Sequence, residues 1–294
     1  MEEGEASSPA PQLRASFTAL SEYSACPLRY RYLHVEHRDE PAVEPDWRAA
    51  PREPALGVAS TFDRNFGRAV HAALKTWQGD VDSGLAPVTA DLEARISDVA
   101  QREGLDHAQL QRALVALHKG LDAYVRGPWP RCRTIALEHS AQHRLSERGF
   151  TLELALRVDR IAETDGRVAI IDFKTVPPHA MQLRADIWQL RTYALAAPEL
   201  LGVATRRLRL LLIDLRQDRV REVGHSAEDL RLAAQQLLAC ARAIAGGDFD
   251  VAAGHEDRPC WCCGFRLSCP ASLAPRPPAQ PRHTGQPAPN TRPQ

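Results

Sequence analysis

The spacing of apolar residues changes along the chain, and the change predicts a helical first part followed by a mixture of strands and helices. Residues 62–78 place Phe66, Val70, Leu74 and Trp77 on one face of a helix. Residues 16–37 indicate two helical segments with a break at Cys26-Pro27, since proline suits the first turn of a helix. Residues of about 86–126 are also helix-patterned and fit an inserted helical segment.

From Thr134 onward the apolar period becomes two, which is typical of strands. The segments predicted as strands are 134–145, 150–162, 167–176 and 206–223. Helices are expected between and after them, at 185–197 and 227–247. Strands that alternate with helices predict an α/β fold with a mixed central sheet flanked by helices.

The two ends of the chain differ in composition from the middle. Residues 1–15 are polar and acidic, and residues 271–294 are rich in proline and poor in apolar side chains. Both segments are expected to be disordered tails. We therefore predict one domain over residues 16–270, with the helical insertion inside it.

A predicted hairpin gathers two acids and a lysine on one face. Asp165-Gly166 joins two alternating strands, and this dipeptide favours a type I′ turn. Counting back from that turn places Asp159 opposite Asp172, with Lys174 two residues further along the same face. Two carboxylates about 5 Å apart repel each other, so a divalent cation between them is one explanation and a solvated charged strand face is the other.

Three other polar residues are candidates for the site only if they lie close to these acids. His71 follows Gly67 by one helical turn, and the glycine leaves room for another group to approach the imidazole. Gln189 and Tyr193 share one face of the helix predicted at 185–197 and lie one turn apart. Either feature alone is also what ordinary packing would produce.

Seven cysteines are present, and four of them lie between residues 260 and 269. Cys260, Cys263 and Cys269 need a fourth ligand to complete a tetrahedral zinc site or a four-iron cluster, and Cys26 is the candidate. Cys132 and Cys240 are expected to be packing residues. The cysteine cluster therefore indicates metal or iron–sulfur binding rather than disulfides.

Overall charge contributes little, because 37 basic residues balance 37 acidic ones. Any nucleic-acid binding must come from a local patch, for which Arg68, Arg157, Arg160 and the stretch from Arg206 are candidates. No apolar run approaches the length of a membrane span, and the N-terminus has no apolar export signal. We expect a cytoplasmic protein without a membrane partner.

The ordered series CPLRYRY, GRAVHAAL, LRVDRIAE, IIDFKT, QLRTYA and CWCCGFRLSCP resembles the RecB-type nucleases of the PD-(D/E)XK superfamily that carry an iron–sulfur staple. The resemblance implies a restriction-endonuclease-like fold. It also implies catalytic roles for Asp159, Asp172, Lys174, Gln189 and Tyr193, and Mg²⁺ or Mn²⁺ bound by His71, Asp159, Asp172 and the Phe173 carbonyl. It implies a [4Fe-4S] cluster on Cys26, Cys260, Cys263 and Cys269, with Zn²⁺ as the alternative, and it favours Cys263 over the adjacent Cys262.

The resemblance further implies a metal-dependent deoxyribonuclease that hydrolyses phosphodiesters, with an exonuclease of DNA repair or recombination as the expected type. DNA is then the main partner. The chain has no G-x-x-x-x-G-K-[ST] stretch, so a motor would have to be a separate helicase or repair subunit. Three alternatives remain open. They are a catalytically silent iron–sulfur module that grips DNA, a zinc-stapled scaffold with no nucleic-acid role, and a nuclease of CRISPR spacer acquisition.

Overall fold

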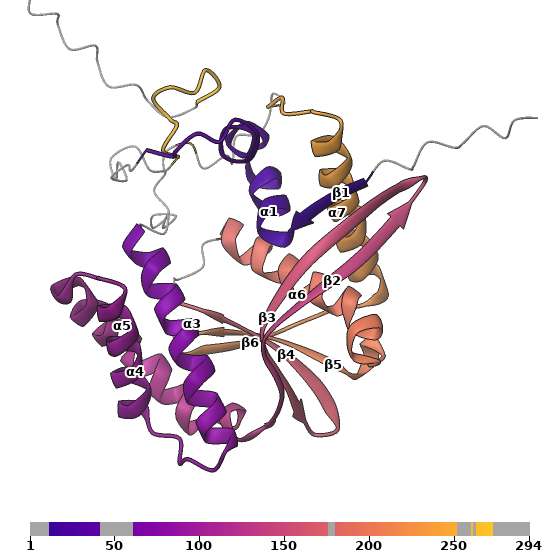
Figure 1. Cartoon of the computed structure of the whole chain (residues 1–294). Helices are drawn as coiled ribbons and strands as arrows, with labels where there is room; N and C mark the ends of the chain where they lie inside the picture. The colour runs from indigo at the N-terminus through magenta and orange to yellow at the C-terminus, as the bar shows by residue number, and fades with distance from the viewer. Residues whose placement is uncertain (1–11, 42–60, 176–179, 252–259, 261–262, 273–294) are drawn as a thin grey trace, which may run out of the picture.

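The computed structural model describes residues 12–41, 61–175, 180–251, 260 and 263–272. Residues 1–11 and 273–294, which make up most of the tails predicted at 1–15 and 271–294, lie outside these ranges, as does Cys262. The described part is an α/β structure built around one sheet (Figure 1). This architecture confirms the fold class predicted from the sequence.

The sheet has six strands in the order β1-β3-β4-β5-β6, and β2 also pairs with β3. Its strands are β1 (Gln12–Ser16), β2 (Arg133–Glu147), β3 (Phe150–Thr164), β4 (Arg167–Lys174), β5 (Leu208–Asp214) and β6 (Arg219–Val223). The sheet is mixed, because β1 and β4 run parallel to their partners β3 and β5, whereas the pairs β2–β3, β3–β4 and β5–β6 are antiparallel. The central strand β4 is apolar on both faces, as expected for a strand covered on both sides.

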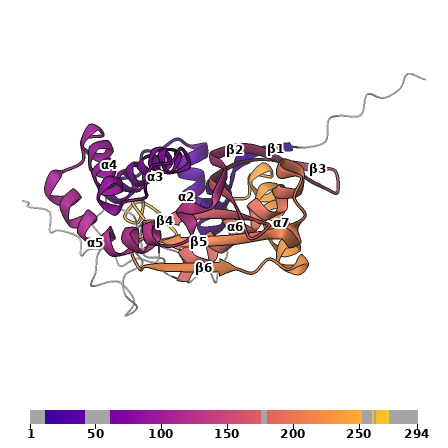
Figure 2. The same ribbon diagram turned by 90° about the horizontal axis from the view of Figure 1, so that it is seen from below.

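Helices cover the two faces of the sheet in two separate groups (Figures 1 and 2). One face packs against α1 (Phe17–Ala25), α6 (Ala180–Leu201) and α7 (Ala227–Ala245). The other face packs against α3 (Thr61–Asp82), α4 (Thr89–Arg102) and α5 (His107–Arg126). Short helical turns complete the chain at α2 (Pro27–Tyr30), η1 (Arg31–Val35), η2 (Trp129–Arg131) and η3 (Thr205–Arg207).

The hairpin between β3 and β4 has the register predicted from its turn. Asp165 and Gly166 have φ of 49° and 69°, which are the left-handed values that a type I′ turn requires at both positions. Thr164 pairs with Arg167, and the ladder continues to the pair Arg160 and Ile171. The next step along this register is Asp159 opposite Asp172, where the regular ladder ends.

Other predicted elements also form, and one expectation was wrong. The chain breaks at Cys26-Pro27 between α1 and α2, and the segment of about 86–126 forms α4 and α5. Residues 12–15, however, belong to β1 rather than to a disordered tail. The sequence QLRAS is short and half polar, and it becomes a strand because its backbone pairs in parallel with residues 151–155 of β3.

Gly120 of α5 lies directly against the backbone of the residue that follows β5. A Cβ at this position would lie 1.8 Å from the carbonyl oxygen of Leu215, at the end of β5. A Cβ on Gly79, inside α3, would have no neighbouring atom within 4 Å. We expect Gly120→Ala to lower the free energy of unfolding by about 2 kcal/mol or more, because the backbone of Leu215 must move.

The matched variant Gly79→Ala is expected to raise the free energy of unfolding by about 0.5–1 kcal/mol, because alanine loses less backbone entropy in a helix. Urea unfolding monitored by circular dichroism measures both values. Equal effects of the two substitutions would contradict the close packing of α5 on β5.

Candidate active site

The site lies where the pairing of β3 with β4 stops, near the end of β4, although β3 continues in the sheet beside β1 and β2. Val158 and Ile161 pack into the same core cluster, although strict alternation would put them on opposite faces. The alternation therefore breaks at Asp159. Its carboxylate accepts a hydrogen bond from the backbone N–H of Phe173 at 2.8 Å, which joins β3 to β4 at the point where the ladder stops.

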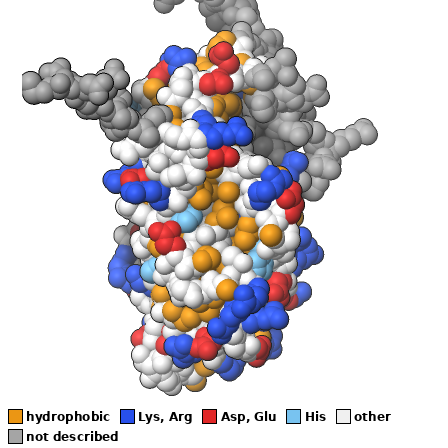
Figure 3. All heavy atoms as spheres, turned by 90° about the vertical axis from the view of Figure 1, so that its right-hand side faces the viewer, with side chains coloured by type: hydrophobic (Ala, Val, Ile, Leu, Met, Phe, Trp, Pro, Cys, Tyr) orange, Lys and Arg blue, Asp and Glu red, His pale blue; other side chains and the backbone are white. Residues whose placement is uncertain are grey.

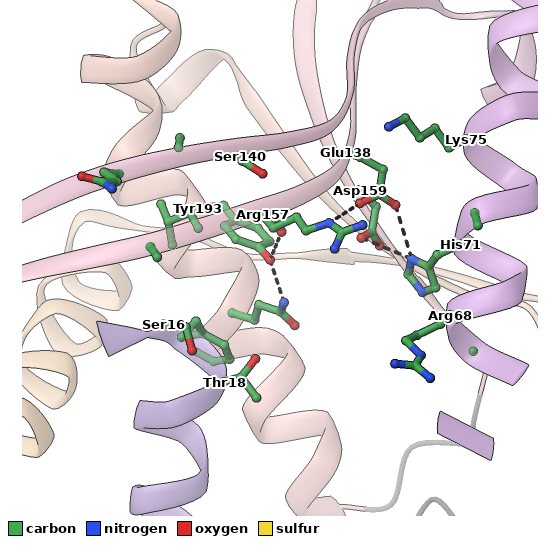
Figure 4. A pocket seen from close by; sticks show the side chains of 18 of the residues that line it. Ser16, Thr18, Arg68, His71, Lys75, Glu138, Ser140, Arg157, Asp159 and Tyr193 are labelled. Carbon is green, nitrogen blue, oxygen red and sulfur yellow. Dashed lines mark hydrogen bonds and ion pairs between the residues drawn. The ribbon is translucent and has the colours of Figure 1, made fainter. Parts of the chain in front are cut away.

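His71 of α3 and Glu138 of β2 meet Asp159 in front of this junction (Figure 4). The distance from His71 Nδ1 to Asp159 Oδ1 is 3.3 Å, and that to Glu138 Oε1 is 3.9 Å. One nitrogen and two carboxylate oxygens, all within 4.8 Å of one another, form a donor set that suits a divalent cation. Among the described residues this is the one such group of three His, Cys, Asp or Glu side chains.

Glu138 was missed by the sequence analysis. It lies inside a long alternating strand and has φ of 50°, which is unusual for a residue other than glycine. The pairing of β2 with β3 shifts nearby, between Thr134 and Ala136. No local feature of the sequence predicts this distorted backbone. The one available signal is that Glu138 is an acid on the strand that pairs with β3, opposite Asp159.

Lys174 and Asp172 lie at the end of β4, on either side of Phe173, whose N–H is bonded to Asp159. The Lys174 ammonium is 2.9 Å from Asp172 Oδ2 and 3.1 Å from Asp186 Oδ1. The contact with Asp172 lacks the direction of a hydrogen bond, so it is a contact between charges. Lys174 Nζ also donates a hydrogen bond to Gln189 Oε1 at 3.1 Å.

A chain of hydrogen bonds fixes the predicted pair on α6. Gln189 Nε2 donates to the Tyr193 hydroxyl at 2.6 Å, and that hydroxyl donates to the carbonyl of Arg157 at 2.6 Å. Gln189 therefore contacts Lys174 directly, and Tyr193 contacts the backbone of β3, so the pair links the lysine to that strand.

Burial and neighbouring charges pull the acids in opposite directions. Burial raises the pKa of Asp172 to about 6, although Lys174 opposes the shift. Burial alone would also raise the pKa of Asp159, but the adjacent His71, the N–H of Phe173 and the charge of Lys174 together hold that pKa below its usual value. Burial would lower the pKa of Lys174, yet Asp172 and Asp186 raise it, so the lysine stays charged.

An open cleft of about 1120 Å³ leads to the acids. Its floor is the β2–β3 ribbon, one wall is α3, and the other wall is made by the start of α1 and by α6 (Figure 4). Arg68 and Lys75 extend from α3, and Arg157 extends from β3, so three cations flank the carboxylates. A cleft with acids at its base and cations at its rim suits an anionic polymer that meets a metal ion.

A family model described as the PD-(D/E)XK nuclease superfamily matches residues 14–270 of the chain. The chain belongs to the PD-(D/E)XK nuclease superfamily. The fold and the arrangement of acids and lysine agree with this membership, and nucleases of the superfamily use divalent metals. Membership therefore supports a metal-dependent nuclease activity.

The crystal structure of SSO0001 is similar to this chain at 15% sequence identity and a TM-score of 0.36. The similarity covers 72% of this chain and 97% of that chain. No curated protein matches the sequence.

Two arginine assignments from the sequence need correction in this nuclease domain. Arg160 is 0% exposed, and its guanidinium donates to Thr134, Tyr124 and two backbone carbonyls, so it is a packing residue rather than a phosphate contact. Arg206 lies just before β5, whose first residue pairs with Val168. Val168 is six residues, or about 20 Å of strand, from Lys174, so the first residue of the stretch, Arg206, does not extend the cationic rim. The later part of the stretch, which runs along β5 toward Lys174, stays a prediction.

Cys26, Cys260, Cys263 and Cys269 line one small hollow beside Arg29 and Arg266. Figure 1 shows the segment from residue 263 next to the chain that follows α1. No three of these sulfurs lie within 4.8 Å of one another. Cys132 and Cys240 lie apart from this hollow, in agreement with their expected packing role.

The rest of the described surface shows no extended area of one charge on the side seen in Figure 3, where acidic and basic side chains alternate around apolar ones. Among the described residues, no helix combines the length and apolar character needed to cross a membrane.

The acids predict that a divalent cation stabilises the fold. With Mg²⁺ or Mn²⁺ at about 100 times its Kd, the free energy of unfolding should rise by about 2.7 kcal/mol. The pKa of Asp172, about 6, lies above that of an ordinary aspartate, so its carboxylate is ionised above pH 6 and protonated below it. Stabilisation by the cation should therefore be larger at pH 7.5 than at pH 5.5.

Thermal melting with and without the cation at the two pH values measures this effect. Asp159→Asn should abolish it, whereas Asp165→Asn, at the distant hairpin turn, should retain it. A shift that is equal at both pH values, or that survives in Asp159→Asn, would contradict the proposed place of the cation.

Proposed function

We propose that this member of the superfamily is a RecB-type DNA nuclease that acts as an exonuclease on DNA ends or single strands in repair or recombination. The observation that carries the proposal is that His71 and Asp159 meet in a cleft with a cationic rim, while the Asp172–Lys174 pair is buried at the end of β4, where the Phe173 N–H bonds Asp159. A binding module that only grips DNA would not need a buried lysine between carboxylates. The phosphates of the DNA would follow Arg68, Lys75 and Arg157, and binding would weaken with salt.

The residues divide the work of phosphodiester hydrolysis. His71, Asp159, Asp172 and the Phe173 carbonyl would hold Mg²⁺ or Mn²⁺, with Glu138 as a further donor beside His71 and Asp159. When bound, the cation neutralises charge on the phosphate and assists formation of the attacking hydroxide. Lys174 orients the attacking water and stabilises negative charge on the phosphate, while Gln189 and Tyr193 hold Lys174 in place.

We further propose that the four cysteines bind a [4Fe-4S] cluster. A tetrahedral zinc site with Zn–S bonds of about 2.3 Å brings all four sulfurs to about 3.8 Å of one another, whereas no three of these sulfurs lie within 4.8 Å of one another here. A four-iron cluster is a larger body and suits more widely spaced thiolates around one hollow. The flanking Arg29 and Arg266 would balance part of the negative charge that thiolates bring to the site.

The cysteine segment has an attachment that does not depend on a cluster. Arg29 forms two hydrogen bonds with Glu40, and Glu40 Oε1 accepts a third from the backbone N–H of Gly264 at 3.0 Å. A Cβ on Gly264 would lie 2.3 Å from the carbonyl oxygen of Pro41. The segment around Cys263 therefore fits closely against the chain that follows Cys26.

The nuclease proposal predicts Mg²⁺- or Mn²⁺-dependent cleavage of end-labelled single-stranded DNA by anaerobically purified protein. Lys174→Ala should lower kcat by about 10²-fold or more, because one stabilising group of the transition state is lost. Lys119→Ala, on the exposed face of α5, serves as the matched control and should cleave like the wild type.

Gel analysis of the products over time measures the rate and the polarity of cutting. Absence of cleavage by wild type, or equal cleavage by wild type and Lys174→Ala, would contradict the nuclease site and favour the DNA-gripping module.

The cluster proposal predicts a brown protein with an absorbance band near about 400 nm, because iron–sulfur thiolates absorb there and zinc thiolates do not. Iron and sulfide analysis should give about four of each per chain. Cys263→Ser should lose the band, whereas Cys132→Ser should keep it. A colourless protein that contains stoichiometric zinc would contradict the iron–sulfur assignment.

A further inference from the structure

Asp186 is a buried acid next to the proposed catalytic lysine, and the nuclease chemistry described above gives it no role. Its side chain is 1% exposed and lies on α6, one turn before Gln189. Its Oδ1 atom is 3.1 Å from the Lys174 ammonium. Burying a carboxylate is costly unless a positive charge compensates it, and Lys174 provides that charge.

Asp186 and Asp172 contact the same ammonium but differ in what else they can reach. Asp172 is on β4, one residue from Phe173, whose N–H is bonded to Asp159. It is therefore the acid that a cation at Asp159 would also draw upon. Asp186 comes from a different element, α6, and its carboxylate is not part of the group around His71, Glu138 and Asp159.

This difference matters when the cation binds. A divalent cation near Asp172 competes with Lys174 for the same carboxylate and repels the ammonium directly. Without another anion, Lys174 would be free to turn away from the reacting phosphate. Gln189 offers Lys174 only a neutral acceptor. Of the two carboxylates that contact the ammonium, Asp172 would be shared with the cation, whereas the contact with Asp186 would remain.

We propose that Asp186 is a positioning residue, which anchors the Lys174 ammonium from α6 while Asp172 is shared with the catalytic cation. Asp186, Gln189 and Tyr193 then form one polar stripe at positions i, i+3 and i+7 of α6. The stripe holds the lysine at two points and is otherwise surrounded by the apolar core that contains Trp188 and Leu190. This inference rests on the proposed nuclease site, but its main test does not need nuclease activity.

Lysine NMR provides that test, because the chain has only three lysines. In full-length protein labelled with ¹³C at lysine Cε, a held side chain gives two resolved Hε signals and a mobile one gives a single averaged signal. Lys75 and Lys119 are exposed and serve as mobile references within the same spectrum. Loss of one signal set in Lys174→Arg assigns Lys174.

The wild type should show a resolved Lys174 pair both without and with Mg²⁺. Asp186→Asn, which has the same shape without the charge, should show the resolved pair collapse when Mg²⁺ is added. Asp214→Asn is the matched control, because Asp214 is also a buried acid, but it accepts hydrogen bonds from backbone N–H groups of the turn after β5. The control should behave like the wild type.

Steady-state kinetics provide a second test of the role of Asp186. Asp186→Asn should lower kcat by about 10²-fold with KM for DNA unchanged, because a displaced catalytic group costs rate rather than binding. Asp186→Glu keeps the charge, should hold Lys174 in the NMR spectrum, and should recover part of the lost rate. If Asp186→Asn does not fold, Asp186→Leu, which also removes the charge, takes its place in both experiments.

A Lys174 pair that stays resolved in Asp186→Asn with Mg²⁺ would overturn the proposal, as would collapse of the pair in Asp186→Glu together with an unchanged rate. If the wild type cleaves no DNA, the proposed function fails, yet the lysine spectra still decide whether Asp186 anchors Lys174.

Discussion

The cost of burying charge at the end of β4 is the constraint on which the rest of this structure depends. Asp172 is 3% exposed, Asp186 is 1% exposed, and Lys174 lies between them. Such a group is stable only where the surrounding backbone and side chains compensate each charge. The central position of β4 provides the burial, and the bend of β3 and the polar stripe of α6 provide the partners.

The two apolar layers meet the site from opposite sides. The α3 layer presents His71, and Gly67 one turn earlier allows close approach, since a Cβ there would lie 3.1 Å from the Thr175 hydroxyl. The α6 layer presents Gln189 and Tyr193. Each layer has its own core, so the functional groups stand on packed helices and meet where the pairing of β3 with β4 stops.

Much of this could be predicted from sequence because local rules were sufficient. The Asp-Gly turn determined the hairpin register, and helical periodicity placed Gln189 and Tyr193 on one face. The alternation of β3 failed only at Asp159, where a local rule gives way to a functional requirement. The roles of these residues followed from the resemblance to the nucleases rather than from periodicity.

Other features depend on contacts between distant parts of the chain and could not be predicted in this way. The strand at residues 12–16 exists because β3 pairs with it, and Glu138 reaches the site through a distorted backbone. Arg160 looked like a surface cation, but five hydrogen bonds from its guanidinium hold it inside the protein. Asp186 has meaning only once the position of Lys174 is known.

The most direct test of the central claim is to locate the cation. A crystal structure with Mn²⁺, analysed by anomalous scattering, should show a single strong peak between His71 and Asp159, within bonding distance of both and of Asp172. A peak elsewhere, or no peak in crystals of a protein that cleaves DNA in Mn²⁺, would contradict the account of this site.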